Sequence, residues 1–323
     1  MKNTILILTG PTASGKTAVS VKIAKMLDCE IISADSIQAY KTLDIGSAKP
    51  SAEEMDGVPH YLIGEIEVDN RDYSVASFKR MADGYISDIA LRGKTPLIVG
   101  GTGLYINALT HPLNFAHVKP NETLRKELAD IEKSEHGALH KMLSSVDPET
   151  ASRLHANDTK RLIRALEVYN ETGKPISAFG NDFSNEKQTI GDYDPIMAGL
   201  TMPRELLYSR IEQRVDKMME SGLMNEVDHL ITENYDESLP ALQGLGYKQL
   251  IAAKNGVCSI DEAINRIKIE TRHFAKRQIT WFKRDKRIKW FDAVDYGTVD
   301  ELAKVIADYY RSELNERKNK YGE

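Results

Sequence analysis

Up to residue 115, short apolar runs alternate with longer segments in which apolar residues recur at helical spacing. Runs typical of buried strands occupy residues 4–9, 29–34 and 95–99, with a briefer one at 61–63. Helical spacing covers residues 18–27, 75–91 after Ser74 as N-cap, and a stretch from about 100 to 109. Strands separated by helices predict a doubly wound α/β fold with a parallel sheet.

From residue 116 to 194 the strand-like runs disappear and helical patterns replace them, at 121–132, 137–143, 147–154 and 158–171. The last of these has Asn157 or Asp158 as its cap and Gly173 just past its end. From residue 190 the pattern predicts a return strand at 190–200 and helices within 203–230 and over 261–283. An extended segment at 290–291 and a final helix at 300–315 follow. We therefore expect a core made of residues 1–115 and 195–315, an all-helical insertion at 116–194 and a fraying tail at 316–323.

Composition adds little to the fold prediction but indicates the class of protein and its cellular compartment. Of the 323 residues, 41% are hydrophobic and 28% charged, which is ordinary for a soluble protein. Cys29 and Cys258 have no metal or redox spacing, and two cysteines suit a reducing compartment. No signal peptide and no membrane-spanning apolar stretch are apparent, so we expect a cytoplasmic protein.

Charge is distributed unevenly along the chain. The window 264–290 holds ten Lys or Arg residues against Glu270 and Asp285, a net +8. Since the whole chain carries −5, the remainder carries −13. A basic segment in an acidic protein indicates a local polyanionic partner.

The segment after the first predicted strand has the form G-x-x-x-x-G-K-T and opens the first predicted helix. Such a loop wraps backbone N–H groups around phosphate oxygens at a helix N-terminus. Lys16 adds a full positive charge, and the Thr17 hydroxyl is placed to ligate Mg²⁺. The pattern predicts a polyphosphate site without saying which polyphosphate. The loop consists of Gly10, Pro11, Thr12, Ala13, Ser14, Gly15, Lys16 and Thr17.

Two more polar motifs follow predicted strands, at the sheet edge where α/β folds bind ligands. Asp35 follows the second strand and suits a general base, a magnesium ligand or an N-cap; we favour the base because polar Ser36 and Gln38 adjoin it. Thr102 lies in a glycine-rich turn after the third strand, which is either a tight connection or a ligand-contacting turn.

Several basic residues have both a structural and a binding interpretation. Arg204, Arg210 and Arg214 are typical of a solvated helix, although a pair aimed at a diphosphate is an alternative. Arg161 and Arg164 lie three residues apart, on a solvated face or against a nucleic-acid backbone. The predicted helix at 261–283 lies mostly within the basic window. We expect its charged face to contact a phosphate backbone and its aromatic residues to pack in the core. That face includes Arg272, Lys276 and Arg277, and the aromatic residues are Phe274, Trp281 and Phe282. His136 and His140 are spaced as metal ligands on a helix are, but we expect a surface pair.

Seven motifs in order resemble the bacterial tRNA dimethylallyltransferases. They are GPTASGKT (10–17), DSIQ (35–38), GSAKP (46–50), GGTGLY (100–105), NDTKRLIRALEV (157–168), GLGYKQ (244–249) and TRHFAKRQITW (271–281). Eukaryotic members of this IPP transferase family carry a zinc finger, for which this chain lacks the cysteines. The resemblance implies a P-loop NTPase-like core with an inserted helical lobe that contacts tRNA.

The resemblance also implies an activity: transfer of a dimethylallyl group from dimethylallyl diphosphate to N6 of the adenosine 3′ of the anticodon, in tRNAs reading codons that begin with U. Asp35 is then the base, and Thr17 the magnesium-linked hydroxyl. Lys16, the loop amides and Arg214 hold the diphosphate. Implied tRNA contacts, in the anticodon stem-loop, are Asp35, Ser36, Ile37, Gln38, Thr102, Thr159, Lys160, Arg161, Leu162 and Ile163. We expect a monomer that needs Mg²⁺.

Two other functions fit parts of the pattern. A small-molecule kinase would use Asp35 to activate a hydroxyl toward ATP, and an RNA-binding ATPase would hydrolyse ATP without transfer. Neither explains why Val99 is followed by Gly100 and Gly101, where a Walker B strand would end in a carboxylate.

Overall fold

The computed structural model describes residues 4–112, 118, 120–179 and 191–321. The chain divides into two compact units. The first, here called the sheet unit, comprises Met1–Thr110 and Ile190–Glu323, and the second, the helical unit, comprises His111–Thr189. The breaks fall at 110/111 and 189/190, where the sequence predicted 115/116 and 194/195.

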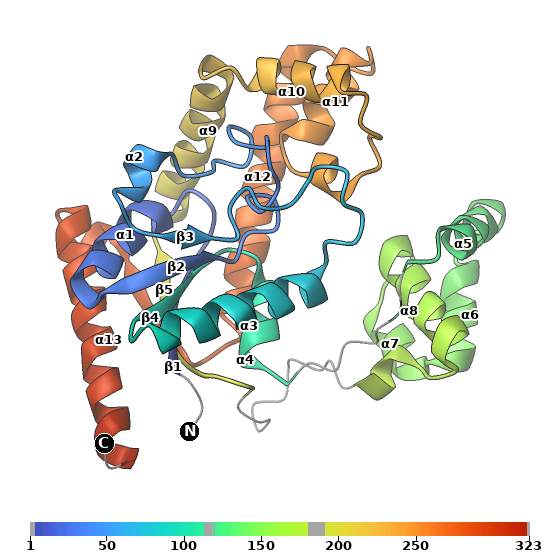
Figure 1. The fold of residues 1–323 in the computed structure, drawn as a ribbon. Coiled ribbons are helices and arrows are strands. Elements are labelled where there is room, and N and C mark those ends of the chain that lie inside the picture. The colour runs from blue at the N-terminus through green and yellow to red at the C-terminus, as the bar shows by residue number, and fades with distance from the viewer. Residues whose placement is uncertain (1–3, 113–117, 119, 180–190, 322–323) are drawn as a thin grey trace. The chain divides into compact units, whose positions relative to one another are not determined.

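The sheet unit is built on one parallel sheet of six strands, in the order β3-β2-β4-β1-β5-β6 (Figure 1). The strands are β1 (Thr4–Thr9), β2 (Cys29–Ser33), β3 (His60–Tyr61), β4 (Thr95–Gly100), β5 (Asp194–Thr201) and β6 (Ile288–Asp292). The first strand of the chain is therefore central, paired with β4 on one side and β5 on the other. The predicted α/β fold class is confirmed. Residues 191–193, predicted as part of the return strand, precede β5, and residue 190 lies outside the described residues.

Alternate residues of each central strand enter two separate apolar cores. In β1, Ile5 and Ile7 pack into one core, whereas Leu6 and Leu8 pack into the other. All four side chains are fully buried. A strand covered by helices on both faces reads as a continuous apolar run, which is why the sequence pattern predicted these strands so well.

Helices cover both faces of the sheet (Figure 1). The helices of the sheet unit are α1 (Lys16–Leu27), α2 (Ala52–Met55), α3 (Val75–Leu91), α4 (Gly103–Thr110), α9 (Arg204–Glu220), α10 (Leu223–Thr232), α11 (Tyr247–Lys254), α12 (Ile260–Phe282) and α13 (Val299–Tyr321). Ser74 caps α3 as predicted, its side chain accepting a hydrogen bond from the Ser77 N–H. The tail is a correction: α13 stays helical to Tyr321, beyond the predicted end at 315.

The helical unit consists of α5 (Glu122–Ser134), α6 (Ala138–Val146), α7 (Pro148–Arg153) and α8 (Thr159–Thr172). Its own core includes Leu128, Leu139, Leu143, Leu162 and Leu166. The carboxylate of Glu167 is fully buried beside this core. It accepts hydrogen bonds from the Asn121 N–H (2.8 Å) and the guanidinium groups of Arg125 (2.7 Å) and Arg164 (2.6 Å). A buried charge with this many donors ties α8 to α5.

Candidate active site

The phosphate loop connects β1 to α1 through a backbone that requires glycine. Gly10 has φ +144, and a Cβ there would lie 2.7 Å from the Leu200 carbonyl oxygen of β5. Gly15 has φ +90 and immediately precedes α1, which begins at Lys16, two residues earlier than the apolar spacing predicted. Left-handed backbone is accessible to glycine at little cost. The loop therefore delivers the N-terminus of α1 to the carboxyl end of β1.

Lys16, the first residue of α1, extends its side chain back to the start of this loop. Its Nζ donates hydrogen bonds to the carbonyls of Gly10 (3.0 Å) and Pro11 (2.8 Å). Loss of solvation, reinforced by the nearby positive charge of Arg214, lowers the pKa of Lys16 to about 8, and Asp35 partly opposes this shift. The loop thus holds a cation that an anionic ligand would stabilise.

Arg214 of α9 reaches the same loop. Its Nη1 lies 3.4 Å from Thr12 Oγ1, to which it donates. Burial lowers the pKa of Arg214, while the charge of Asp35 raises it. The predicted partners Arg204 and Arg210 are exposed, and Arg204 lies over the Tyr208 ring, 5.0 Å from its centroid. Of the three arginines, Arg214 is the one placed at the loop.

Asp35 follows β2, and one of its two carboxylate oxygens caps the turn that comes after it. Its Oδ1 accepts hydrogen bonds from the N–H groups of Ile37 (2.9 Å) and Gln38 (3.3 Å). Among the described residues, its Oδ2 accepts none. The cap interpretation therefore explains one oxygen, and the other is available to a proton or a metal ion.

The glycine-rich turn after β4 is bonded directly to the Asp35 segment. The Thr102 N–H donates to the Ala34 carbonyl (3.1 Å), and Thr102 Oγ1 accepts from the Ser36 N–H (3.2 Å). A Cβ on Gly100 would lie 2.3 Å from the Ala34 oxygen, so this approach requires glycine. The three predicted motifs do meet at the carboxyl ends of β1, β2 and β4.

The Gln38 side chain forms its hydrogen bonds within the protein. Its amide oxygen accepts from Ser33 Oγ (3.2 Å), and its Nε2 donates to the carbonyls of Ala48 (2.9 Å) and Ser47 (3.3 Å). The side chain of Ile37 packs against the core. Within the DSIQ motif, Asp35 and Ser36 are thus the residues whose side chains remain for substrate.

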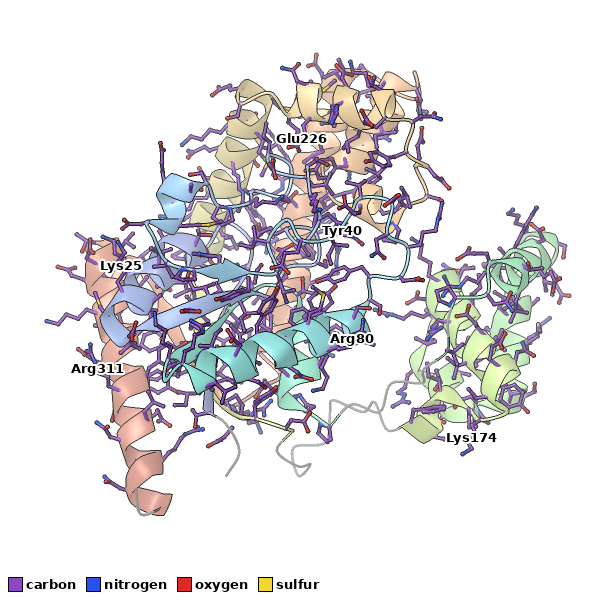
Figure 2. The ribbon with its side chains drawn as sticks, viewed as in Figure 1. Lys25, Tyr40, Arg80, Lys174, Glu226 and Arg311 are labelled. Atoms are coloured by element: carbon purple, nitrogen blue, oxygen red, sulfur yellow. The ribbon has the colours of Figure 1, made fainter. Side chains whose placement is uncertain are left out.

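The segment that Gln38 contacts is held from the other side by Glu226 of α10, which is labelled in Figure 2. Its carboxylate accepts hydrogen bonds from the N–H groups of Asp44 (2.8 Å), Ile45 (2.7 Å) and Gly46 (3.0 Å). It also accepts one from the Tyr247 hydroxyl (2.6 Å). A Cβ on Gly46 would lie 2.5 Å from the Tyr247 ring, which explains the glycine of the GSAKP motif. Sequence reasoning found the motif but missed Glu226, because no local pattern marks it.

An aromatic cluster that the sequence did not predict lies within electrostatic reach of Asp35. The ring centroids of Tyr40 and Tyr73 are 5.6 Å apart, and those of Phe78 and Tyr105 are 4.1 Å apart. Burial raises the pKa of Tyr73 and Tyr105, with a small contribution from the negative charge of Asp35. The Tyr73 hydroxyl is buried without a hydrogen-bond partner among the described residues. All four residues belong to the apolar core of the sheet unit, so this core extends close to Asp35.

The predicted RNA-contacting residues of α12 differ in their availability. Lys276 and Arg277 are exposed, and Arg277 lies 5.8 Å from the Phe274 ring centroid. Arg272 instead pairs with Glu212 and lies 5.7 Å from the Tyr208 centroid. Phe282 is buried in the core, as expected.

In α8 the side chains of the predicted RNA contacts differ in burial. Leu162 is fully buried in the core of the helical unit, so its side chain cannot contact RNA. Ile163 packs against the same core, and Arg164 is bound by Glu167. The side chains left toward solvent are Thr159, Lys160 and Arg161, and Arg161 pairs with Asp158 at 2.9 Å.

His136 and His140, which the sequence spacing singled out, have separate partners. His136 Nδ1 lies 3.2 Å from Glu132, whereas His140 Nε2 lies 3.0 Å from the Ala151 carbonyl oxygen. The surface interpretation fits His136, and His140 has a role in joining α6 to α7.

Comparison with known proteins gives a consistent family assignment. The family model described as IPP transferase matches residues 38–285. A tRNA dimethylallyltransferase of Thermoanaerobacter sp. (strain X514) is 47% identical over 96% of this chain and 98% of its own length. The tRNA dimethylallyltransferase of Carboxydothermus hydrogenoformans is 48% identical over 95% of this chain and 98% of its own length.

Solved structures agree with this assignment. The tRNA isopentenylpyrophosphate transferase of Bacillus halodurans aligns over 100% of both chains, with 38% identity and a TM-score of 0.74. A eukaryotic dimethylallyltransferase acting on tRNA aligns over 96% of this chain and 80% of its own, with 27% identity and a TM-score of 0.79. In the part of the chain that the structure describes, no helix is both long and apolar enough to cross a membrane. The match over nearly the whole chain, in sequence and in fold, shows that this protein belongs to the IPP transferase family.

Proposed function

We propose that the protein is a tRNA dimethylallyltransferase. It moves a dimethylallyl group from dimethylallyl diphosphate to N6 of the adenosine 3′ of the anticodon, in tRNAs reading codons that begin with U. The observation that carries this proposal is that two cations, Lys16 and Arg214, both contact the phosphate loop and that the carboxylate charge of Asp35 acts on both. A leaving group that is a polyanion and a nucleophile that must lose a proton require this combination.

The phosphate loop is the proposed cradle for the leaving diphosphate. As the bond between the dimethylallyl C1 and its oxygen breaks, negative charge grows on the diphosphate. Lys16 and Arg214 face that charge from a setting with little solvent, where electrostatic stabilisation is strong. Lys16 would exchange the carbonyls of Gly10 and Pro11 for phosphate oxygens.

Asp35 is the proposed base. While N6 of adenosine forms its bond to C1, the N6 proton passes to Oδ2, the carboxylate oxygen that accepts no hydrogen bond among the described residues. The bonds from Ile37 and Gln38 fix the other oxygen and so set the direction of the free one. An aromatic amine is a weak nucleophile, so a positioned base increases the rate.

Mg²⁺ fits the chemistry of the loop. Thr17 follows Lys16 directly in α1, and its hydroxyl would be the ligand that the protein supplies. Mg²⁺ prefers oxygen ligands and commonly takes most of them from phosphates and water. When bound, it neutralises part of the charge on the leaving group.

RNA recognition is assigned to the exposed cations of α12 and to the helical unit. Lys276 and Arg277 would contact the phosphate backbone, and Lys160 and Arg161 would contact the anticodon stem-loop. An adenosine must leave its stack before its N6 can reach the carboxylate of Asp35. A protein that binds the RNA through two units suits that requirement, and a monomer contains both.

A labelled-substrate assay tests the proposal. Unmodified tRNA is incubated with Mg²⁺ and labelled dimethylallyl diphosphate, using the wild type, Asp35→Asn, and Asp69→Asn as a control at an exposed carboxylate. We expect label in the tRNA with the wild type and the control. With Asp35→Asn the rate should fall by about 10²–10⁴ while tRNA binding persists.

A parallel incubation with ATP and nucleosides addresses the kinase alternative. ATP-dependent phosphorylation with no label in tRNA would contradict the proposal. A normal rate with Asp35→Asn would support the transfer reaction but show that Asp35 is not its base.

A further inference from the structure

Gln278 of α12 is buried at 6% exposure, yet both ends of its amide are bonded to loops of the active site. Its Oε1 accepts a hydrogen bond from the Thr12 N–H of the phosphate loop (2.8 Å). Its Nε2 donates to the Gly101 carbonyl of the turn after β4 (2.9 Å). One side chain therefore bridges two loops that are far apart in sequence.

The bridge needs an amide in one orientation. If the amide were reversed, Nε2 would face the Thr12 N–H and Oε1 would face the Gly101 carbonyl, so neither hydrogen bond would form. A buried side chain without hydrogen-bonding groups would leave both backbone groups unpaired, which costs more than the bonds are worth in water. The position thus selects the donor and acceptor pair that glutamine carries.

The glycines of the turn exist because α12 approaches it so closely. A Cβ on Gly101 would lie 2.2 Å from Gln278 Nε2. A Cβ on Gly103 would lie 2.3 Å from Trp281 Cδ1, on the same helix one turn later. The contact between α12 and the turn is therefore close on both sides of Thr102.

Each bonded backbone group adjoins one part of the proposed chemistry. Thr12 lies in the phosphate loop, and its hydroxyl is the group that Arg214 contacts. Gly101 precedes Thr102, whose backbone and side chain are bonded to Ala34 and Ser36, the two neighbours of Asp35. The series from Arg214 through Thr12, Gln278 and Thr102 ends at the base.

We propose that Gln278 is a positioning residue that sets the spacing between the phosphate loop and Asp35. The inference rests on the proposed transfer reaction. There the base accepts the proton of N6, which attacks C1 on the side opposite the leaving diphosphate. A displacement of about 1 Å between such groups can cost about a hundredfold in rate. Gln278 touches neither reacting group, so its effect passes through the two loops.

Gln278→Met tests this inference, because methionine has similar length and no amide. The measurement is the single-turnover rate constant for prenyl transfer, with enzyme in excess over tRNA and both substrates saturating. A merely structural loss would reduce the fraction of active enzyme and hence the amplitude, but not the rate constant. We expect the rate constant to fall about ten- to a hundredfold, with the Kd for tRNA changed less than about twofold.

Gln249→Met is the matched control. Gln249 lies on α11, is also 6% exposed, accepts from the Gly246 N–H (2.9 Å) and donates to Glu270 Oε2 (3.0 Å). The substitution removes the same number of hydrogen bonds from a buried glutamine that contacts neither loop. We expect its rate constant to match the wild type. Gln278→Asn, which keeps the amide but is too short to reach both loops, should behave like Gln278→Met and decides the question if the methionine variant does not fold.

The outcomes separate this inference from the proposed function. Wild-type transfer with an unchanged rate constant in Gln278→Met and Gln278→Asn would overturn the role of Gln278 alone. An equal slowing in Gln249→Met would also overturn it, because the effect would then be general. No transfer by the wild type would overturn the proposed function, and the role of Gln278 with it.

Discussion

Lys16 shows how a single residue links stability and binding in this site. Its pKa of about 8 lies below the ordinary value of 10.5, because burial disfavours the charged form. Between these two values the folded protein binds fewer protons than the unfolded chain, so this residue makes stability rise with pH there. Below pH 8 the lysine is charged in both states, and the desolvation cost is fully present.

Binding of a diphosphate should have the opposite pH dependence. As pH rises through about 8, Lys16 loses its charge in the free enzyme, and we expect the affinity for inorganic pyrophosphate to fall. Calorimetric titration at pH 7 to 9.5, in two buffers of different ionisation enthalpy, would show proton uptake on binding above pH 8. Lys16→Met is the control that removes this uptake and leaves only the ionisation of pyrophosphate. Equal uptake in both proteins would contradict the assignment.

For single residues, the sequence predicted which loops form the site better than it predicted which side chains make which contacts. The G-x-x-x-x-G-K-T pattern and the Asp35 turn were visible because loop and strand ends have local signatures. Gln278 was not singled out, since its bond to Gly101 joins residues 177 apart in the sequence. Leu162 was assigned to RNA by motif, although its apolar side chain lies in a core that only the packing of four helices defines. Local patterns identify loops, whereas burial and distant contacts depend on tertiary structure.

At the scale of elements, α10 and α11 position a loop of the site without entering it. The carboxylate of Glu226 on α10 receives hydrogen bonds from three consecutive backbone N–H groups and from Tyr247 at the start of α11. The sequence did not predict α11, which spans only 8 residues and follows a glycine-rich stretch. A helix this short gains its stability from packing and has a weak periodic signal.

Glu226→Gln tests this arrangement. The amide group keeps one acceptor oxygen but turns a donor toward N–H groups, so we expect a loss of about 1–3 kcal/mol in the free energy of unfolding. Urea unfolding measures the loss, and hydrogen exchange at the amides of Asp44, Ile45 and Gly46 should become faster. Glu233→Gln, at an exposed carboxylate just past the end of α10, is the control. Unchanged exchange at the three amides would contradict the role of Glu226.

At the scale of the whole molecule, the sheet unit and the helical unit have separate apolar cores. The sheet unit contains every residue placed near the phosphate loop, and the helical unit has its own core and its own buried carboxylate. The sequence predicted this division because strand-like patterns end and helical patterns begin at a definite point. It could not predict the breaks to the residue, since connecting segments have no periodicity.

Leu139→Ala should separate the two units energetically. Leu139 is fully buried in the helical unit, and its truncation should cost about 2–5 kcal/mol there. We expect urea to unfold the helical unit at lower concentration, with loss of tRNA affinity, while pyrophosphate binding by the sheet unit is retained. Met142→Ala, at a 38% exposed position of the same helix, should have a small effect. A single shifted transition for both binding activities would show that the units unfold together.

The central place of β1 has a consequence for synthesis on the ribosome. β1 is made first, but its partner β5 ends at Thr201, after the whole helical unit. Tyr310 of α13, whose hydroxyl donates to the Ile7 carbonyl of β1, emerges later still. The helical unit is synthesised in full by Thr189, so it can fold while β1 is still paired on only one side. The nascent chain thus completes the helical unit before the sheet, and a translation product interrupted between them would contain a folded helical unit but no complete sheet to support the phosphate loop.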